Sequence, residues 1–263
     1  MQRVTARSRD GTAIAFERSG AGPAVILVDG ALGSRAFGSM PKLAKLLAQY
    51  FTVITYDRRG RGESGDTQPY AKEREVEDIA ALIHEAGGSA HLLGVSSGAA
   101  LALQAAASGL AVTKVAAYEP PYVAEDHGSR QIDHESNLRA MIAAGRRGDA
   151  VRYFMRDMVN VPWIFVYMMQ LRPRIWGKMK AVAHTLPYDV AVMTKFVVPT
   201  EQFSKIDVPT LVMHGGKTDP RLKRAATAVA AAIPNAEHRT LEGQTHNVNV
   251  YVLAREVVDF FAS

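Results

Sequence analysis

The chain has 263 residues, enough for one large α/β domain with a substantial core and too few to favour two full-sized domains. It contains no cysteine, which excludes disulfides and thiolate metal sites and fits a reducing compartment, so we expect a cytoplasmic protein. The formal net charge of +5 comes without a nucleic-acid-binding pattern, and the longest apolar stretch, 161–171, is roughly half a membrane span, so we expect neither a nucleic-acid partner nor a membrane segment.

The expected elements alternate between strand and helix along most of the chain. Residues 4–20 contain two alternating segments around Asp10-Gly11, a dipeptide favoured in hairpin turns, which predicts a β-hairpin. Short runs that are apolar on both faces predict buried parallel strands at 24–28, 51–56, 90–95 and 113–118. Helical patterns follow at 41–50, 73–87 and 97–109, and two more strand-helix pairs occupy 210–233 and 236–263. This order predicts an α/β fold with a doubly wound, mostly parallel sheet.

Between residues 122 and 205 the alternation stops and the pattern becomes helical. Seven of the ten methionines fall between Met141 and Met193. We therefore predict a helical cap at 122–205, inserted into a core domain of 1–121 and 206–263. Flexible methionine side chains suit a surface that accepts apolar ligands, although they are equally expected in the cap's own core. The side chains expected to line a substrate pocket are Met155, Met158, Trp163, Tyr167 and Trp176.

The stretch HLLGVSSGAAL, residues 91–101, holds Ser96 between Gly94 and Gly98 where a predicted strand meets a predicted helix. Only glycine fits beside the serine in so tight a turn. In such a turn the Ser96 hydroxyl stands at the carboxyl edge of the sheet. The helix that begins at Ser97 offers its free N–H groups to a developing oxyanion. We therefore predict that Ser96 is a nucleophile.

A serine nucleophile needs a base and a carboxylate at the same edge of the sheet. His246 follows the last predicted strand and precedes the terminal helix, which is the chain position expected for the base. Two carboxylates follow strands on the correct side: Asp219 in a Gly216-x-x-Asp loop, and Glu119 after the strand that follows the serine helix. We expect Asp219 to orient His246, with Glu119 as the alternative acid.

These residues together resemble the α/β-hydrolase superfamily over nearly the whole chain. Residues 56–65, YDRRGRGESG, look like the family's Asp-x-Arg-Gly-x-Gly-x-Ser loop. The segment VDGALGS, residues 28–34, occupies the place of the family's His-Gly oxyanion loop, with Asp29 where histidine is usual. The resemblance implies that the backbone N–H groups of Ala31 and Ser97 form the oxyanion hole. Because a charged carboxylate aimed at a developing oxyanion is unfavourable, we expect Asp29 to point away from it, toward an arginine or loop amides.

The Asp29-Gly30 dipeptide, the Ser96-Ser97 pair and Glu119 are also similar to zearalenone-type lactone hydrolases, in which the acid occupies the Glu119 position. Residues and resemblance together predict a serine hydrolase that cleaves a carboxylic ester or lactone of an apolar small molecule. Non-hydrolytic enzymes of the same fold, with C–C cleavage, perhydrolase or cyclase chemistry, are alternatives, as is a low-turnover ligand-binding protein. Because the sequence has no dinucleotide fingerprint and no metal-ligand spacing, we expect no cofactor and no metal.

Overall fold

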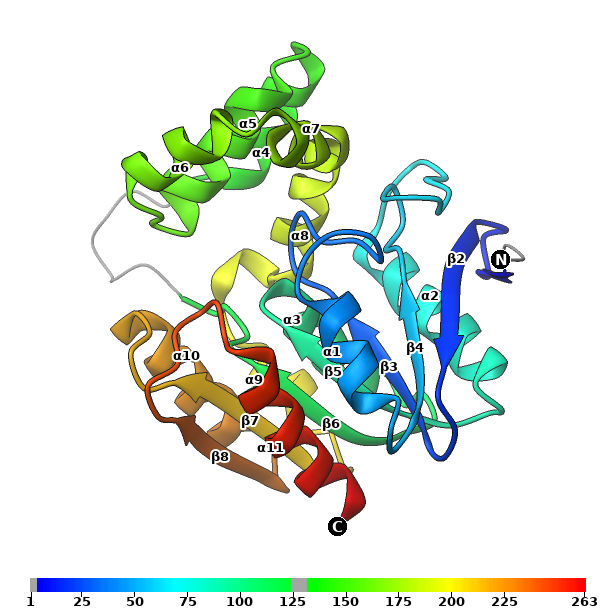
Figure 1. Cartoon of the computed structure of the whole chain (residues 1–263). Coiled ribbons are helices and arrows are strands. Elements are labelled where there is room, and N and C mark those ends of the chain that lie inside the picture. Colours follow the sequence, from blue (N-terminus) through cyan, green and yellow to red (C-terminus); the bar gives the residue numbers. More distant parts are fainter. Residues whose placement is uncertain (1–3, 124–131) are drawn as a thin grey trace.

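The computed structural model describes residues 4–123 and 132–263, in which eight strands form one sheet in the order β1-β2-β4-β3-β5-β6-β7-β8 (Figure 1). The pairs β1·β2 and β2·β4 are antiparallel, and the remaining pairs are parallel. From β3 the chain crosses first to β4 and then to β5 on the opposite side, which makes the sheet doubly wound. The predicted fold class is therefore confirmed.

The elements of the sheet domain fall close to their predicted ranges. The strands are β1 Val4–Arg7, β2 Ala13–Ser19, β3 Ala24–Val28, β4 Thr52–Tyr56, β5 Ala90–Val95, β6 Val112–Tyr118, β7 Thr210–Gly215 and β8 Ala236–Leu241. The helices beside them are α1 Met40–Leu47, α2 Lys72–Glu85, α3 Ser97–Ala107, α10 Pro220–Ala232 and α11 Val250–Ala262. The β1–β2 hairpin turns at Gly11, where a φ of 84° requires the left-handed geometry that glycine adopts freely.

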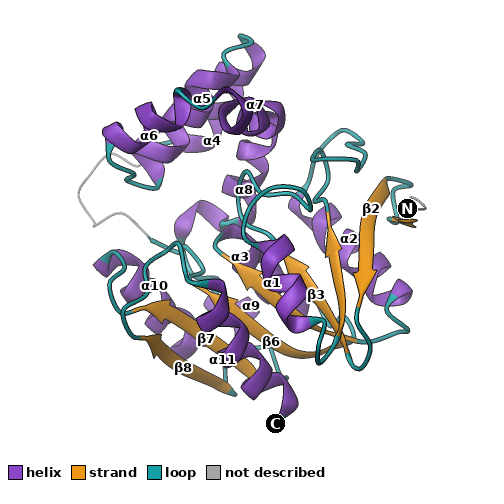
Figure 2. Cartoon of the chain, in the orientation of Figure 1, coloured by secondary structure: helices purple, strands orange, loops and turns teal. Residues whose placement is uncertain are grey.

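Helices cover both faces of the sheet, and β3 shows why. Its side chains Ile26 and Val28 pack into a core with α2, α3 and α10, whereas Val25 and Leu27 point to the other face and pack with α1 and α11. Figure 2 shows helices on both sides of the sheet. A strand that is apolar at every position must bury both of its faces. The carboxyl ends of β3, β5, β6 and β7 consequently lie next to one another at one edge of the sheet.

A separate layer of helices lies between β6 and β7 in the sequence (Figure 1). Its elements are α4 His134–Ala143, α5 Arg147–Tyr153, η1 Phe154–Met158, α6 Trp163–Gln170, α7 Pro173–Val182, η2 Ala183–Thr185, α8 Leu186–Val192 and η3 Thr194–Phe196, followed by α9 Thr200–Phe203. We call residues 134–196 the cap helices. They share a core that includes Leu138, Val151 and Leu186, and Leu32 from the loop after β3 packs into it. Residues 124–131 of the predicted cap lie outside the described residues. None of the helices in the described ranges is long and apolar enough to cross a bilayer.

Candidate active site

Ser96 occupies the sharp turn that joins β5 to α3. Its φ of 56° and ψ of −128° are unusual for a residue with a side chain, and such strain persists only where the surrounding structure enforces it. A Cβ atom at position 94 would lie 2.4 Å from the Gly98 carbonyl oxygen, and one at position 98 would lie 2.2 Å from the Val28 carbonyl oxygen. The two glycines therefore allow α3 to pack directly against β5 and β3, which holds Ser96 at the sheet edge.

Ala31 and Ser97, the predicted oxyanion donors, belong to the two segments that flank Ser96. Ser97 is the first residue of α3, so its N–H has no partner within the helix. Ala31 follows Gly30, at which a Cβ atom would lie 3.1 Å from the Ser96 Cβ and 3.8 Å from its Oγ. Within residues 4–123 and 132–263, neither the Ala31 N–H nor the Ser97 N–H has a hydrogen-bond acceptor. Both groups remain able to bind an oxyanion.

His246 is paired with Glu119. The His246 Nδ1 lies 2.6 Å from the Glu119 Oε2, and the Glu119 carboxylate also accepts hydrogen bonds from the Gly215 N–H at 2.8 Å and the Thr218 hydroxyl at 3.1 Å. Glu119 follows β6 and is completely buried. A buried carboxylate at this distance favours the tautomer in which Nδ1 carries the proton, which leaves Nε2 free to act as a base.

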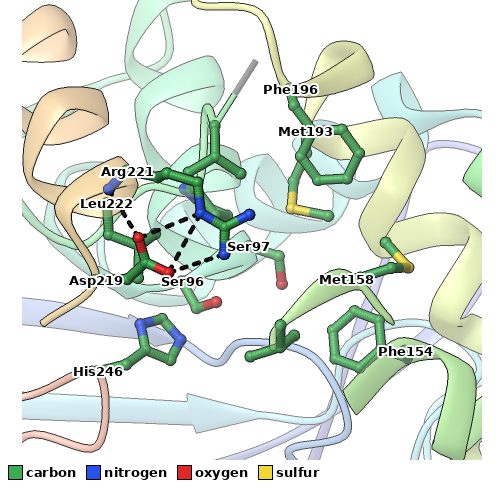
Figure 3. A pocket seen from close by; sticks show the side chains of 13 residues that line it. Ser96, Ser97, Phe154, Met158, Met193, Phe196, Asp219, Arg221, Leu222 and His246 are labelled. Carbon is green, nitrogen blue, oxygen red and sulfur yellow. Dashed lines mark hydrogen bonds and ion pairs between the residues drawn. The ribbon is translucent and has the colours of Figure 1, made fainter. Parts of the chain in front are cut away.

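Asp219 does not orient His246, so this prediction is wrong. Its carboxylate caps α10 by accepting the Arg221 N–H at 2.8 Å, and it forms an ion pair with the Arg221 guanidinium, also at 2.8 Å (Figure 3). The hydrogen bond from the Arg221 side chain lowers the pKa of Asp219. An aspartate directly before Pro220 at the start of an alanine-rich helix is a typical N-cap pattern, and this signal in the sequence favours the role that the structure gives Asp219.

Asp29 follows β3 and turns toward its own loop. Its Oδ1 accepts the Gly30 N–H at 2.9 Å, and its carboxylate fills the space that Cβ atoms at Gly33 and Gly38 would need. Its Oδ2 is buried and has no hydrogen-bond partner within the described ranges. Burial raises the pKa of Asp29 to about 7, although the nearby Arg61 and Arg58 act in the opposite direction. The carboxylate thus meets a loop amide, one of the two expected kinds of partner.

One pocket joins the sheet edge to the cap helices. It contains Ser96, Ser97 and His246 on one side, and Figure 3 shows apolar cap side chains across the space from them. The apolar side chains that line it are Pro121, Val123, Phe154, Met158, Val159, Met193, Phe196 and Leu222. Asp219 and Arg221 supply its charged wall. Ser96 and His246 therefore face a mainly apolar space with one ion pair at its margin.

Of the side chains predicted to line this pocket, the structure places only Met158 there. Trp163 and Tyr167 lie on α6, where 67% and 52% of their surface is exposed, and Trp176 is buried in the core of the cap helices together with half-buried Met155. The sequence pattern does not show which side chains of α6 face a pocket and which face solvent, because α6 is apolar around most of its circumference. The aromatic lining instead comes from Phe154 at the start of η1 and from Phe196 in η3.

The sequence model described as "Alpha/beta hydrolase family" matches residues 20–260. The structure is similar to that of an alpha/beta hydrolase from Sphaerobacter thermophilus DSM 20745, with 54% identity and a TM-score of 0.91 over 98% of this chain and all of that one. It is also similar to a thermophilic esterase from Thermogutta terrifontis, with 21% identity and a TM-score of 0.74 over 100% of this chain and 98% of that one. An enol-lactonase from Burkholderia xenovorans LB400 has 22% identity and a TM-score of 0.71 over 99% of this chain and 100% of that one. The two similarities near 20% identity establish a shared fold, whereas the family match spans most of the sequence. The chain therefore belongs to the alpha/beta hydrolase family.

Proposed function

We propose that the protein is a serine hydrolase that cleaves a carboxylic ester or lactone of an apolar small molecule. The observation that carries the proposal is the 2.6 Å contact between His246 Nδ1 and the buried Glu119 carboxylate, in the same pocket as the strained Ser96. A serine, a histidine and a carboxylate in this arrangement are the parts that nucleophilic acyl transfer requires. The family membership supports hydrolysis as the class of reaction.

In the first half of the reaction the Ser96 Oγ attacks the substrate carbonyl carbon while His246 Nε2 takes the hydroxyl proton. The Glu119 carboxylate stabilises the imidazolium that forms. The carbonyl oxygen becomes an oxyanion and binds the N–H groups of Ala31 and Ser97. When the intermediate collapses, the C–O bond to the alcohol breaks and the alkoxide receives the proton from His246. In a lactone, that alcohol stays attached to the acyl chain.

In the second half, water attacks the acyl-enzyme. His246 Nε2 takes a proton from the water, the oxyanion forms again in the same site, and the ester bond to Ser96 breaks. The proton returns to the Ser96 oxygen and the carboxylic acid leaves. The cycle restores the starting enzyme and consumes one water, so no redox partner or metal is needed to balance it.

The apolar pocket wall supports an apolar acyl group as the substrate class. Phe154, Met158, Met193 and Phe196 all come from the cap helices, and the sheet edge supplies the reacting groups. We therefore propose that residues 122–205 act as a cap that selects substrates by burying their apolar part. Each buried methylene contributes about 0.8 kcal/mol, so ester preference should rise with acyl length until the pocket is full.

A fluorophosphonate probe followed by intact-protein mass spectrometry tests this proposal. One probe per chain is expected, on the peptide that contains Ser96, and Ser96→Ala should abolish labelling and turnover of p-nitrophenyl esters. Ser204→Ala removes an exposed serine away from the pocket and serves as the matched control that keeps both. Labelling at another serine, or full turnover by Ser96→Ala, would contradict the proposal. A panel of lactones then separates lactonase from esterase activity.

A further inference from the structure

Asp189, on α8 of the cap helices, is not one of the residues that line the pocket, but its buried carboxylate accepts three hydrogen bonds, one of them from the pocket residue Ser97. Its Oδ1 accepts the Ser97 hydroxyl at 2.7 Å and the Arg58 guanidinium at 2.7 Å. Its Oδ2 accepts the Arg61 guanidinium at 2.7 Å. All of these side chains are at most 1% exposed, so solvent neither competes for the bonds nor screens the charges. A buried network of this kind fixes the positions of its members.

Arg61 links the Asp189 carboxylate to the loop after β3. Its Nη1 donates to the Gly30 carbonyl oxygen at 2.6 Å. The Gly30 carbonyl and the Ala31 N–H belong to one peptide unit, which is planar and trans, so the two bonds lie in one plane and point in opposite directions. Anchoring the carbonyl to Arg61 therefore also fixes the direction of the Ala31 N–H. The Thr185 hydroxyl, which accepts from the Arg61 Nε at 3.0 Å, restrains the guanidinium further.

Ser97 connects the same carboxylate to the other oxyanion donor. Its side chain donates to Asp189 while its backbone N–H, at the first position of α3, is left without an internal acceptor. A hydroxyl held by a buried carboxylate limits how far this first residue of the helix can shift. Arg58 reinforces the junction because its Nη1 also lies 3.3 Å from the Asp29 carbonyl oxygen and 3.4 Å from the Ser97 hydroxyl.

We propose that Asp189 is a positioning residue that holds both halves of the oxyanion hole in register, Ser97 directly and the Gly30–Ala31 peptide through Arg61. The inference rests on the proposed function, because the hole matters only if an oxyanion forms at Ser96. It also links the cap helices to the reaction. The carboxylate that aligns the hole lies on α8, so the hole is fully aligned only when α8 is packed against the sheet domain.

The charge of Asp189 suits this role. Burial alone would raise its pKa, but Arg61 and Arg58 outweigh burial and hold the pKa of Asp189 below its usual value. The carboxylate therefore stays ionised and can accept from both arginines and from Ser97 at once. A neutral amide in its place offers one acceptor oxygen and two unwanted donors, so at least one of these bonds is lost.

The test compares Asp189→Asn with Asp78→Asn. Asp78 is equally buried and forms a two-bond ion pair with Arg59 in the same arginine-rich loop, but its described contacts do not reach the Gly30–Ala31 peptide or Ser97. Both variants lose a buried charge and should lose stability. For Asp189→Asn we expect kcat to fall about 10- to 100-fold, since small displacements of transition-state donors cost this much, while KM changes less than about threefold. For Asp78→Asn kcat should stay within about threefold of the wild type.

A second readout separates positioning from simple loss of structure. A trifluoromethyl ketone that adds to Ser96 places an oxyanion in the hole, whereas the corresponding alcohol does not. Asp189→Asn should therefore weaken binding of the ketone by the same factor by which it lowers kcat, and it should leave the affinity for the alcohol unchanged. If Asp189→Asn does not fold, Ser97→Ala removes one arm and keeps the backbone N–H, and it should lower kcat about 3- to 10-fold.

Three results would overturn the inference. The first is that Asp189→Asn matches Asp78→Asn in kcat, and the second is that it weakens ketone and alcohol equally. The third result applies if Asp189→Asn does not fold and Ser97→Ala does: a kcat of Ser97→Ala equal to that of the wild type. Fluorophosphonate labelling of the wild type is measured alongside. Normal labelling with any of these results removes the positioning role alone, whereas failure to label Ser96 removes the proposed function and the inference with it.

Discussion

Replacing the Glu119 carboxylate by an amide tests the pairing with His246 most sharply. The buried carboxylate accepts from three donors: the His246 Nδ1, the Gly215 N–H and the Thr218 hydroxyl. In Glu119→Gln one carboxylate oxygen becomes an NH₂ group, which cannot accept from any of them. If it faces His246, the imidazole must place its proton on Nε2 and can no longer act as a base. We therefore expect kcat to fall by about 10³ to 10⁴, which corresponds to about 4 to 5.5 kcal/mol of transition-state stabilisation.

Asp219→Asn is the matched control, because it makes the same isosteric change on the carboxylate that the sequence favoured. Asparagine caps a helix as well as aspartate does, and Asp219 pairs with Arg221 and not with His246. We expect kcat to stay within about threefold of the wild type. Both variants are assayed with a p-nitrophenyl ester, and circular dichroism checks that each is folded. A large loss in Asp219→Asn with a small loss in Glu119→Gln would refute the reasoning.

Three further predictions concern stability and selectivity. Asp29 keeps its proton up to about pH 7 in the folded protein but releases it near pH 4 when unfolded, so ionisation of Asp29 lowers the stability of the fold as pH rises from about 4 to 7. In urea unfolding, the free energy of unfolding of Asp29→Asn should therefore exceed that of the wild type by up to about 4 kcal/mol at pH 8 and by nothing below pH 4. Gly98→Ala places a Cβ 2.2 Å from a backbone oxygen and should destabilise by about 1 to 3 kcal/mol, whereas Gly177→Ala, in open space within α7, should stabilise by about 0.5 to 1 kcal/mol. Phe154→Ala should cut the preference for octanoate over acetate esters about tenfold, and Phe165→Ala, on the exposed surface of α6, should not; equal effects of the two would contradict the pocket lining.

The sheet could be predicted because its signals are local. The apolar run AVILV predicts a strand buried on both faces, and β3 covers those five residues, Ala24–Val28. The glycines beside Ser96 likewise act within a few residues, through the close approach of α3 to β5. Short-range sterics and apolar periodicity are therefore enough to locate the sheet edge at which the site lies.

Which carboxylate pairs with His246, and which side chains line the pocket, depends on contacts between distant parts of the chain. Glu119 and His246 are 127 residues apart, and the sequence offered two carboxylates at equivalent strand ends. The two carboxylates differ in their local partners: Asp219 already caps α10, so only Glu119 is left to pair with His246. The prediction of the pocket lining was mostly wrong for a related reason. An aromatic residue such as Trp163 occupies the same place in the apolar pattern whether its side chain faces a pocket or solvent.

The acyl-enzyme on Ser96 is the central claim, and rapid-quench mass spectrometry tests it most directly. The protein is mixed with p-nitrophenyl octanoate, quenched within the first turnover and weighed intact, while p-nitrophenol release is followed in parallel. We predict one octanoyl group per chain, located on the peptide that contains Ser96, together with steady turnover and loss of both in Ser96→Ala. Steady turnover that continues unchanged in Ser96→Ala, with no acyl group on the chain at any quench time, would contradict the claim.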